Sequence, residues 1–176
     1  MLNEKIEKLI NTQITKELYS STLYLSMSAW FASMSLDGFA KWYYIQTQEE
    51  RDHALIFYHY MKQIGVRTKF ELLAEPTFEF KDIVDILEQT VKHEEFITAS
   101  IYEIVKAANE ANDYKTVQFL NWFIEEQVQE ENNANTNLNR FKTMGLDGKA
   151  VYLLDQELKA RVYTKTPLLV TMEAAA

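Results

Sequence analysis

The scarcity of helix-breaking residues is the feature that most limits how this chain can fold. Its 176 residues include only four glycines and two prolines, the residue types that interrupt helices most strongly. Residues 1–37, 39–64 and 77–144 contain neither of them. The last stretch would be about 100 Å long as one straight helix, which is too long for one globular domain. We therefore expect a break at Asn109–Asp113, where most residues favour turns.

The chain is predicted to form an all-α bundle of four long helices in one domain, residues 1–176. The helices are expected over residues 4–34, 38–64, 80–109 and 113–144, followed by a short fifth helix over 148–161 and a tail, residues 162–176, in which we find no interpretable pattern. Ser35–Gly38 forms a tight turn, so the first two helices should be antiparallel. The connection over residues 65–79 can reach about 50 Å when extended, which is enough to cross the whole bundle. Helices two and three would then be parallel.

Composition and charge argue against several classes of function. The chain has no cysteine, so disulfides, thiolate metal sites and thiol catalysis are excluded. It has no apolar run long enough for a membrane span, and its first ten residues contain acids where a secretory signal would be apolar. We therefore expect a cytoplasmic protein. The net charge of −8 with scattered lysines and arginines disfavours nucleic-acid binding and favours attraction of cations.

Polar side chains interrupt the apolar faces of all four long helices near their midpoints. On a helical wheel, these residues are Glu17 in the first helix, Glu50 and His53 in the second, Glu94 in the third, and Gln127 and Glu130 in the fourth. Any one of these carboxylates is more simply explained as an edge residue that reaches water. Together, however, four buried anions would repel one another and cost several kcal/mol each. Because the apolar faces carry no lysine or arginine, a bound metal is the simplest explanation of the whole set.

The ligand types favour iron or manganese over a structural zinc ion, because they are carboxylate oxygens and one imidazole without a thiolate. His53 follows Glu50 by three residues, so both side chains lie on one helix face and can reach one cation. Glu50 is therefore expected to bridge two metal ions. Tyr24 lies two turns from Glu17 on the same face, and its pattern fits a core aromatic as well as a redox-active or hydrogen-bonding neighbour of the metals. His59 and His93 are expected at the surface or next to the ligands.

The sequence resembles the non-haem bacterial ferritins over nearly its whole length, to about residue 161. The strings that carry the resemblance are LINTQITKELYSSTLYLSMSAWF, QEERDHA, HEEFIT, FLNWFIEEQVQEE and GKAVYLLDQELK. The resemblance implies a ferritin-like four-helix bundle with one long crossover and a short C-terminal helix. It also implies that Glu17 and His53 bind a first iron, that Glu50 bridges, that Glu94 and Glu130 bind a second, and that Gln127, Tyr24 and Trp122 lie next to these ligands.

The implied function is iron storage with ferroxidase activity. In this family, ferrous iron is oxidised by dioxygen or peroxide at a di-iron site and stored as a ferric oxyhydroxide mineral inside a hollow homo-oligomeric shell of 24 subunits. A first alternative is a di-iron oxidoreductase of the peroxidase type. Such proteins usually add a cysteine-ligated iron domain, and this chain has no cysteine. A second alternative is a shell that only nucleates mineral, against which the complete ligand set argues.

Haem is not expected, because the chain departs from the haem-binding relatives at two places. Those relatives repeat Glu-x-x-His on the fourth helix, where this chain has Gln127 and Glu130. Their haem-ligating methionine follows the bridging glutamate, where this chain has Arg51.

A third iron site is expected to be weak or absent. Family members often build it from acids at the places of Glu49, Glu126, Gln129 and Glu130. Position 129 is a neutral glutamine in this chain, and a neutral ligand attracts a cation less than an anion does. We therefore predict two well-occupied irons per subunit.

Overall fold

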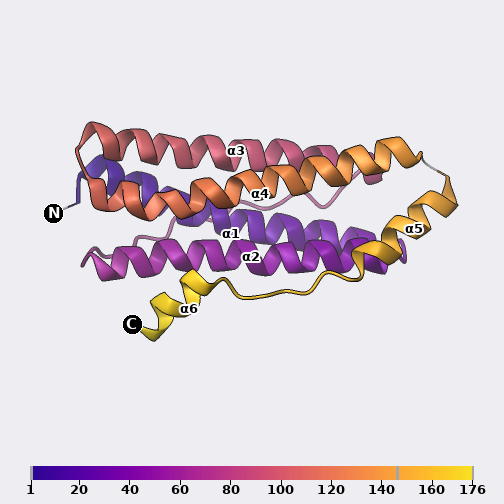
Figure 1. The fold of residues 1–176 in the computed structure, drawn as a ribbon, viewed down its shortest axis with the longest axis horizontal. Helices are drawn as coiled ribbons and strands as arrows, with labels where there is room; N and C mark the ends of the chain where they lie inside the picture. The colour runs from indigo at the N-terminus through magenta and orange to yellow at the C-terminus, as the bar shows by residue number, and fades with distance from the viewer. Residues whose placement is uncertain (1, 146, 176) are drawn as a thin grey trace.

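The computed structural model describes residues 2–145 and 147–175. Within this part of the chain there are six helices and no strand (Figure 1). The helices are α1 (Glu4–Ser33), α2 (Asp37–Gln63), α3 (Ile83–Glu110), α4 (Tyr114–Met144), α5 (Gly148–Leu158) and α6 (Pro167–Ala174). The first four form the bundle, which confirms the predicted all-α ferritin-like class. No helix among the described residues is both long and apolar enough to cross a bilayer.

Side-chain caps define where four of the helices begin. Asn3, Asp82, Asp113 and Asp147 each accept a hydrogen bond from a main-chain amide in the first turn of α1, α3, α4 and α5, respectively. Such a cap satisfies an amide that has no partner inside the helix. The cap at Asp82 makes α3 begin at Ile83, three residues later than the sequence predicted.

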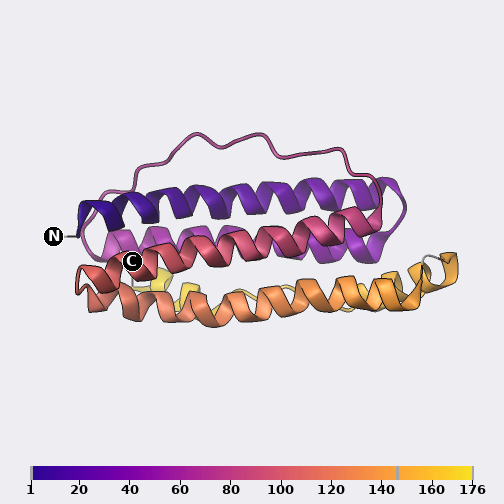
Figure 2. The ribbon, with the colours of Figure 1, turned by 90° about the horizontal axis from the view of Figure 1, so that it is seen from above.

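The long crossover between α2 and α3 runs the length of the bundle on the outer side of α1 (Figure 2). Several hydrogen bonds to α1 hold it there, including two that use its main chain. The main-chain amide of Lys69 donates to Asn11 Oδ1 at 2.7 Å, and Ser26 Oγ donates to the carbonyl of Thr77 at 2.7 Å. The crossover returns the chain to the other end, so α2 and α3 are parallel, as predicted.

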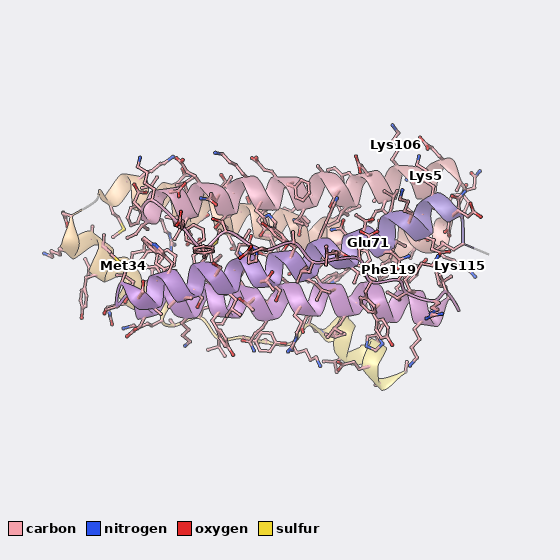
Figure 3. The ribbon with its side chains drawn as sticks, turned by 180° about the vertical axis from the view of Figure 1, so that it is seen from behind. Lys5, Met34, Glu71, Lys106, Lys115 and Phe119 are labelled. Carbon is pink, nitrogen blue, oxygen red and sulfur yellow. The ribbon has the colours of Figure 1, made fainter. Side chains whose placement is uncertain are left out.

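Two apolar clusters fill the bundle on either side of a polar middle layer. The first contains Ile10, Phe57, Ile101 and Phe123, and the second contains Phe31, Phe39, Ile86 and Phe141, each with further buried neighbours. Figure 3 shows side chains of the long helices meeting between the ribbons, while Lys5 and Lys106 point outward at one end. The middle layer therefore lies in the buried interior of the bundle, with apolar side chains on both sides.

The C-terminal residues fold, although the sequence offered no interpretable pattern for them. After α5 ends at Leu158, the chain runs extended along α2 and then forms α6, which begins with Pro167 (Figure 1). Leu169 of α6 is fully buried against the first apolar cluster. The predicted fifth helix was too long at its end, because the chain leaves the helix to bring Arg161 onto α2.

Candidate metal centre

All six polar residues predicted on the apolar faces lie in the middle layer, and none is more than 4% exposed. They are Glu17 from α1, Glu50 and His53 from α2, Glu94 from α3, and Gln127 and Glu130 from α4. Each of the four bundle helices therefore contributes at least one carboxylate to one buried layer. Each of these residues lies on the same side of its helix as the apolar residues, so the helical period that turns the apolar side chains inward also turns these polar groups inward.

Ligand atoms converge in two groups that share one histidine. Glu17, Glu50 and His53 form the first group, and His53, Glu126 and Glu130 form the second, each with its ligand atoms within 4.8 Å of one another. His53 Nδ1 lies 3.5 Å from Glu50 Oε2, and its Nε2 lies 4.0 Å from Glu126 Oε1. The first group contains the residues that the resemblance assigns to the first iron.

Glu94 belongs to neither of these groups, and both of its carboxylate oxygens accept hydrogen bonds. The hydroxyl of Tyr24 donates to Glu94 Oε1, and Gln127 Nε2 donates to Glu94 Oε2 at 3.3 Å. The sequence left two roles open for Tyr24, and the structure gives it a hydrogen bond to a predicted ligand. The Trp122 ring, predicted nearby, lies with its centroid 5.6 Å from that of His53.

Two buried glutamines that the sequence reasoning missed also hold the carboxylates. Gln13 Nε2 donates to Glu17 Oε1 at 2.8 Å, and Gln46 Nε2 donates to Glu130 Oε2 at 2.7 Å and to Glu50 Oε1 at 3.4 Å. Each glutamine precedes a predicted ligand by four residues, which is one helical turn. That spacing was the signal that could have found them.

Burial and mutual repulsion favour the protonated forms of these carboxyl groups when no cation is present. Burial is the largest cause, and a neighbouring carboxylate adds to it, so the pKa values of Glu17, Glu94 and Glu130 rise to about 8. The pKa of Glu50 also lies well above its ordinary value, first through burial and then through Glu130. Glu17 Oε2 is buried without a hydrogen-bond partner. A cation placed here would relieve both the repulsion and the unpaired oxygen.

The residues predicted for a third site lie on the flank between α2 and α4. Glu126 faces His53, and Glu49 forms an ion pair with Arg161, which follows α5. Gln129 is exposed to solvent. The flank therefore contains a positive side chain that the sequence analysis did not place there.

Known proteins share both this fold and much of this sequence. Residues 7–144 match the family described as Ferritin, ferritin-like domain. A bacterial non-heme ferritin of Campylobacter jejuni is 37% identical over 159 residues, which cover 90% of this chain and 95% of that protein. A probable bacterial non-heme ferritin-like protein of Haemophilus influenzae is 36% identical over 90% of this chain and 96% of its own length. A novel open-pore ferritin from the hyperthermophilic archaeon Archaeoglobus fulgidus superposes with a TM-score of 0.90 at 36% identity, over 92% of this chain and 100% of that one.

Proposed function

The chain belongs to the ferritin family, and on that premise we propose that it oxidises ferrous iron at the buried centre and stores the product as a ferric oxyhydroxide mineral. The observation that carries the proposal is the layer of four buried carboxylates and one histidine between two apolar clusters. We further propose that identical chains, 24 in number, assemble into the hollow shell that holds the mineral in the cytoplasm. Iron is the substrate of this reaction, and dioxygen or peroxide is the oxidant.

In the proposed centre, Glu17 and His53 Nδ1 bind one ferrous ion, Glu94 and Glu130 bind the second, and Glu50 bridges. Hard oxygen ligands and one imidazole suit iron. The acids lose their protons when iron binds, because the cation replaces the proton that burial otherwise favours. The anionic ligands then stabilise the ferric product more strongly than the ferrous substrate, because the ferric ion carries more positive charge.

Two adjacent ferrous ions supply the electrons that the oxidant needs. Each ion gives up one electron, so a pair reduces one dioxygen with two protons to hydrogen peroxide, or one peroxide with two protons to water. The neighbouring side chains keep the ligands in place during this change. Gln13 holds Glu17, Gln46 holds Glu130, and Tyr24 and Gln127 hold Glu94.

The test is the oxidation rate of Glu50→Ala, measured by stopped-flow absorbance after ferrous iron is mixed with air-saturated buffer. We expect the variant to lose the fast oxidation phase, because the two ions no longer share a ligand. It should still elute as an assembled particle, near 24 times the chain mass of 20.7 kDa, because Glu50 is buried inside the bundle and not on a surface that could contact another chain. Glu95→Ala is the matched control, since Glu95 is exposed on α3. Oxidation by Glu50→Ala at the rate of the parent protein would overturn the assignment of the bridge.

A further inference from the structure

Arg161 reaches from the end of α5 to one face of α2, where both of its terminal guanidinium nitrogens donate hydrogen bonds. Its Nη1 donates to Gln46 Oε1 at 2.8 Å and to the main-chain carbonyl of Trp42 at 3.3 Å, and its Nη2 donates to Glu49. The guanidinium also lies over the indole ring, with Cζ 4.5 Å from the ring centroid of Trp42. A carboxylate beside an aromatic ring favours arginine specifically, because the planar guanidinium can donate to the carboxylate and stack on the ring at the same time.

The chain after Arg161 continues along the same face of α2 and is attached to the bundle by further contacts. We call residues 161–174 the C-terminal strap. Tyr163 donates its hydroxyl hydrogen to Asp52 Oδ2 at 2.5 Å, and Leu169 is fully buried in the first apolar cluster. The α2 partners Trp42, Gln46, Glu49 and Asp52 are spaced by three or four residues, so they form one stripe of the helix. The strap therefore has three anchors, and Arg161 is the one beside the iron centre.

Arg161 is connected to the proposed iron ligands through Gln46. The amide oxygen of Gln46 accepts from Arg161, which leaves its nitrogen to donate to Glu130 Oε2 at 2.7 Å and to Glu50 Oε1 at 3.4 Å. The arginine thus sets which way the amide points. A rotated amide would direct its oxygen at Glu130, and two acceptors would face each other once Glu130 is ionised.

The flank carboxylates next to this arginine are arranged like an incomplete cation site. Glu126 and Glu130 converge with His53 within 4.8 Å, and Glu49 stands beside them with Arg161 as its partner. A divalent ion bound to Glu49 would lie at contact distance from the guanidinium. Repulsion between the two cations at that distance weakens metal binding by about tenfold or more, even where solvent screens it.

We propose that the guanidinium of Arg161 supplies the positive charge that the carboxylates between α2 and α4 require, and that its pairing with Glu49 keeps a third metal ion from binding there. The inference builds on the proposed iron centre but concerns the carboxylates beside it. It also differs from the explanation based on position 129. A neutral Gln129 removes one ligand charge, whereas Arg161 adds a competing positive charge that remains when position 129 is changed.

The test distinguishes the effect of Gln129 from that of Arg161 by comparing four proteins: the parent, Gln129→Glu, Arg161→Gln and the double variant. Crystals of each are soaked with zinc, a redox-inert probe, and occupancies are read from anomalous maps. The parent and Gln129→Glu should hold two ions per subunit. Arg161→Gln should hold a third ion near Glu49, with its affinity raised by about tenfold or more, because the repelling charge is gone. The double variant should bind the third ion most tightly.

Two further variants separate the charge from the attachment of the strap. Arg161→Lys keeps the positive charge, and Tyr163→Phe removes an anchor without changing the charge, so both should retain two ions. If Arg161→Gln does not assemble, Arg161→Met replaces it, because methionine keeps an apolar stem over Trp42.

A third ion in the parent, in Gln129→Glu or in Arg161→Lys would overturn the proposal, and so would two ions in Arg161→Gln. These readouts do not depend on iron oxidation. Slow oxidation by the parent would contradict the proposed function and leave the zinc occupancies to decide the role of Arg161.

Discussion

Replacement of Glu17 by glutamine should make the metal-free protein more stable at neutral pH, although it removes a proposed iron ligand. Glu17 is fully buried, accepts a hydrogen bond from Gln13 on Oε1 and has no partner for Oε2. Glutamine has the same shape. Its carbonyl oxygen keeps the bond from Gln13, and its amide nitrogen can donate toward Glu50, which lies in the same converging group.

The size of the effect follows from the pKa of Glu17, which burial and then Glu50 raise from 4.5 to about 8. An unfolded chain releases this proton near pH 4.5, whereas the folded protein keeps it until about pH 8. Between these values the folded state binds one more proton than the unfolded state, so the free energy of unfolding falls as the pH rises. The slope is about 1.4 kcal/mol per pH unit for one group, or about 3 kcal/mol between pH 4.5 and pH 7.

Glutamine does not titrate, so the variant loses this contribution to the slope. The free energy of unfolding of Glu17→Gln minus that of the parent should therefore grow by about 1.4 kcal/mol for each pH unit between pH 5 and pH 7. Glu94 and Glu130 have the same raised pKa and remain in both proteins. They lower the stability of both proteins with rising pH, so most of their contribution cancels in the difference. The part that does not cancel is the share of the Glu94 shift that comes from the charge of Glu17, which is among the smaller causes of that shift.

The assay is guanidinium denaturation of both proteins with a chelator, at one protein concentration and at pH 5, 6 and 7. Glu95→Gln is the control, because Glu95 is exposed on α3 and should give a constant difference from the parent. Added zinc should reverse the order of stability, since a ligand that binds only the folded state stabilises it and the variant binds less. A difference for Glu17→Gln that does not change with pH would refute the reasoning.

Two further predictions concern haem and the C-terminal strap. Arg51 follows the proposed bridge Glu50, at the place where the haem-binding relatives have their ligating methionine, so protein purified from cells grown with a haem precursor should show no Soret band. A haem bound through methionine would contradict this. Leu169→Ala should lower the free energy of unfolding by roughly 2–4 kcal/mol, because it leaves a cavity at a fully buried site, whereas Val170→Ala on the exposed side should change it by less than about 0.5 kcal/mol. Equal effects of the two substitutions in denaturant titrations would show that α6 does not pack as described.

The sequence alone determined the four bundle helices and the position of the buried carboxylate layer along them. Breakers are rare, and the few that occur lie between the helices or in their first turns, so the boundaries of α1, α2 and α4 were predictable. The inward direction of Glu17, Glu50 and Glu94 followed from helical periodicity, which is a local property of the chain. Gln13 and Gln46 follow the same periodicity, so their inward direction could also have been predicted from the sequence.

Only the tertiary structure decided the course of the strap and the partner of Glu49. The segment that forms α6 is short, and its polar residues Thr171 and Glu173 do not share one side, so it has no periodicity that would mark a buried face. Its place depends on the first apolar cluster, in which Leu169 is buried. The ion pair between Arg161 and Glu49 joins residues 112 positions apart. No local pattern specifies such a pair, because it exists only after the bundle has packed and α5 has turned the chain back along α2.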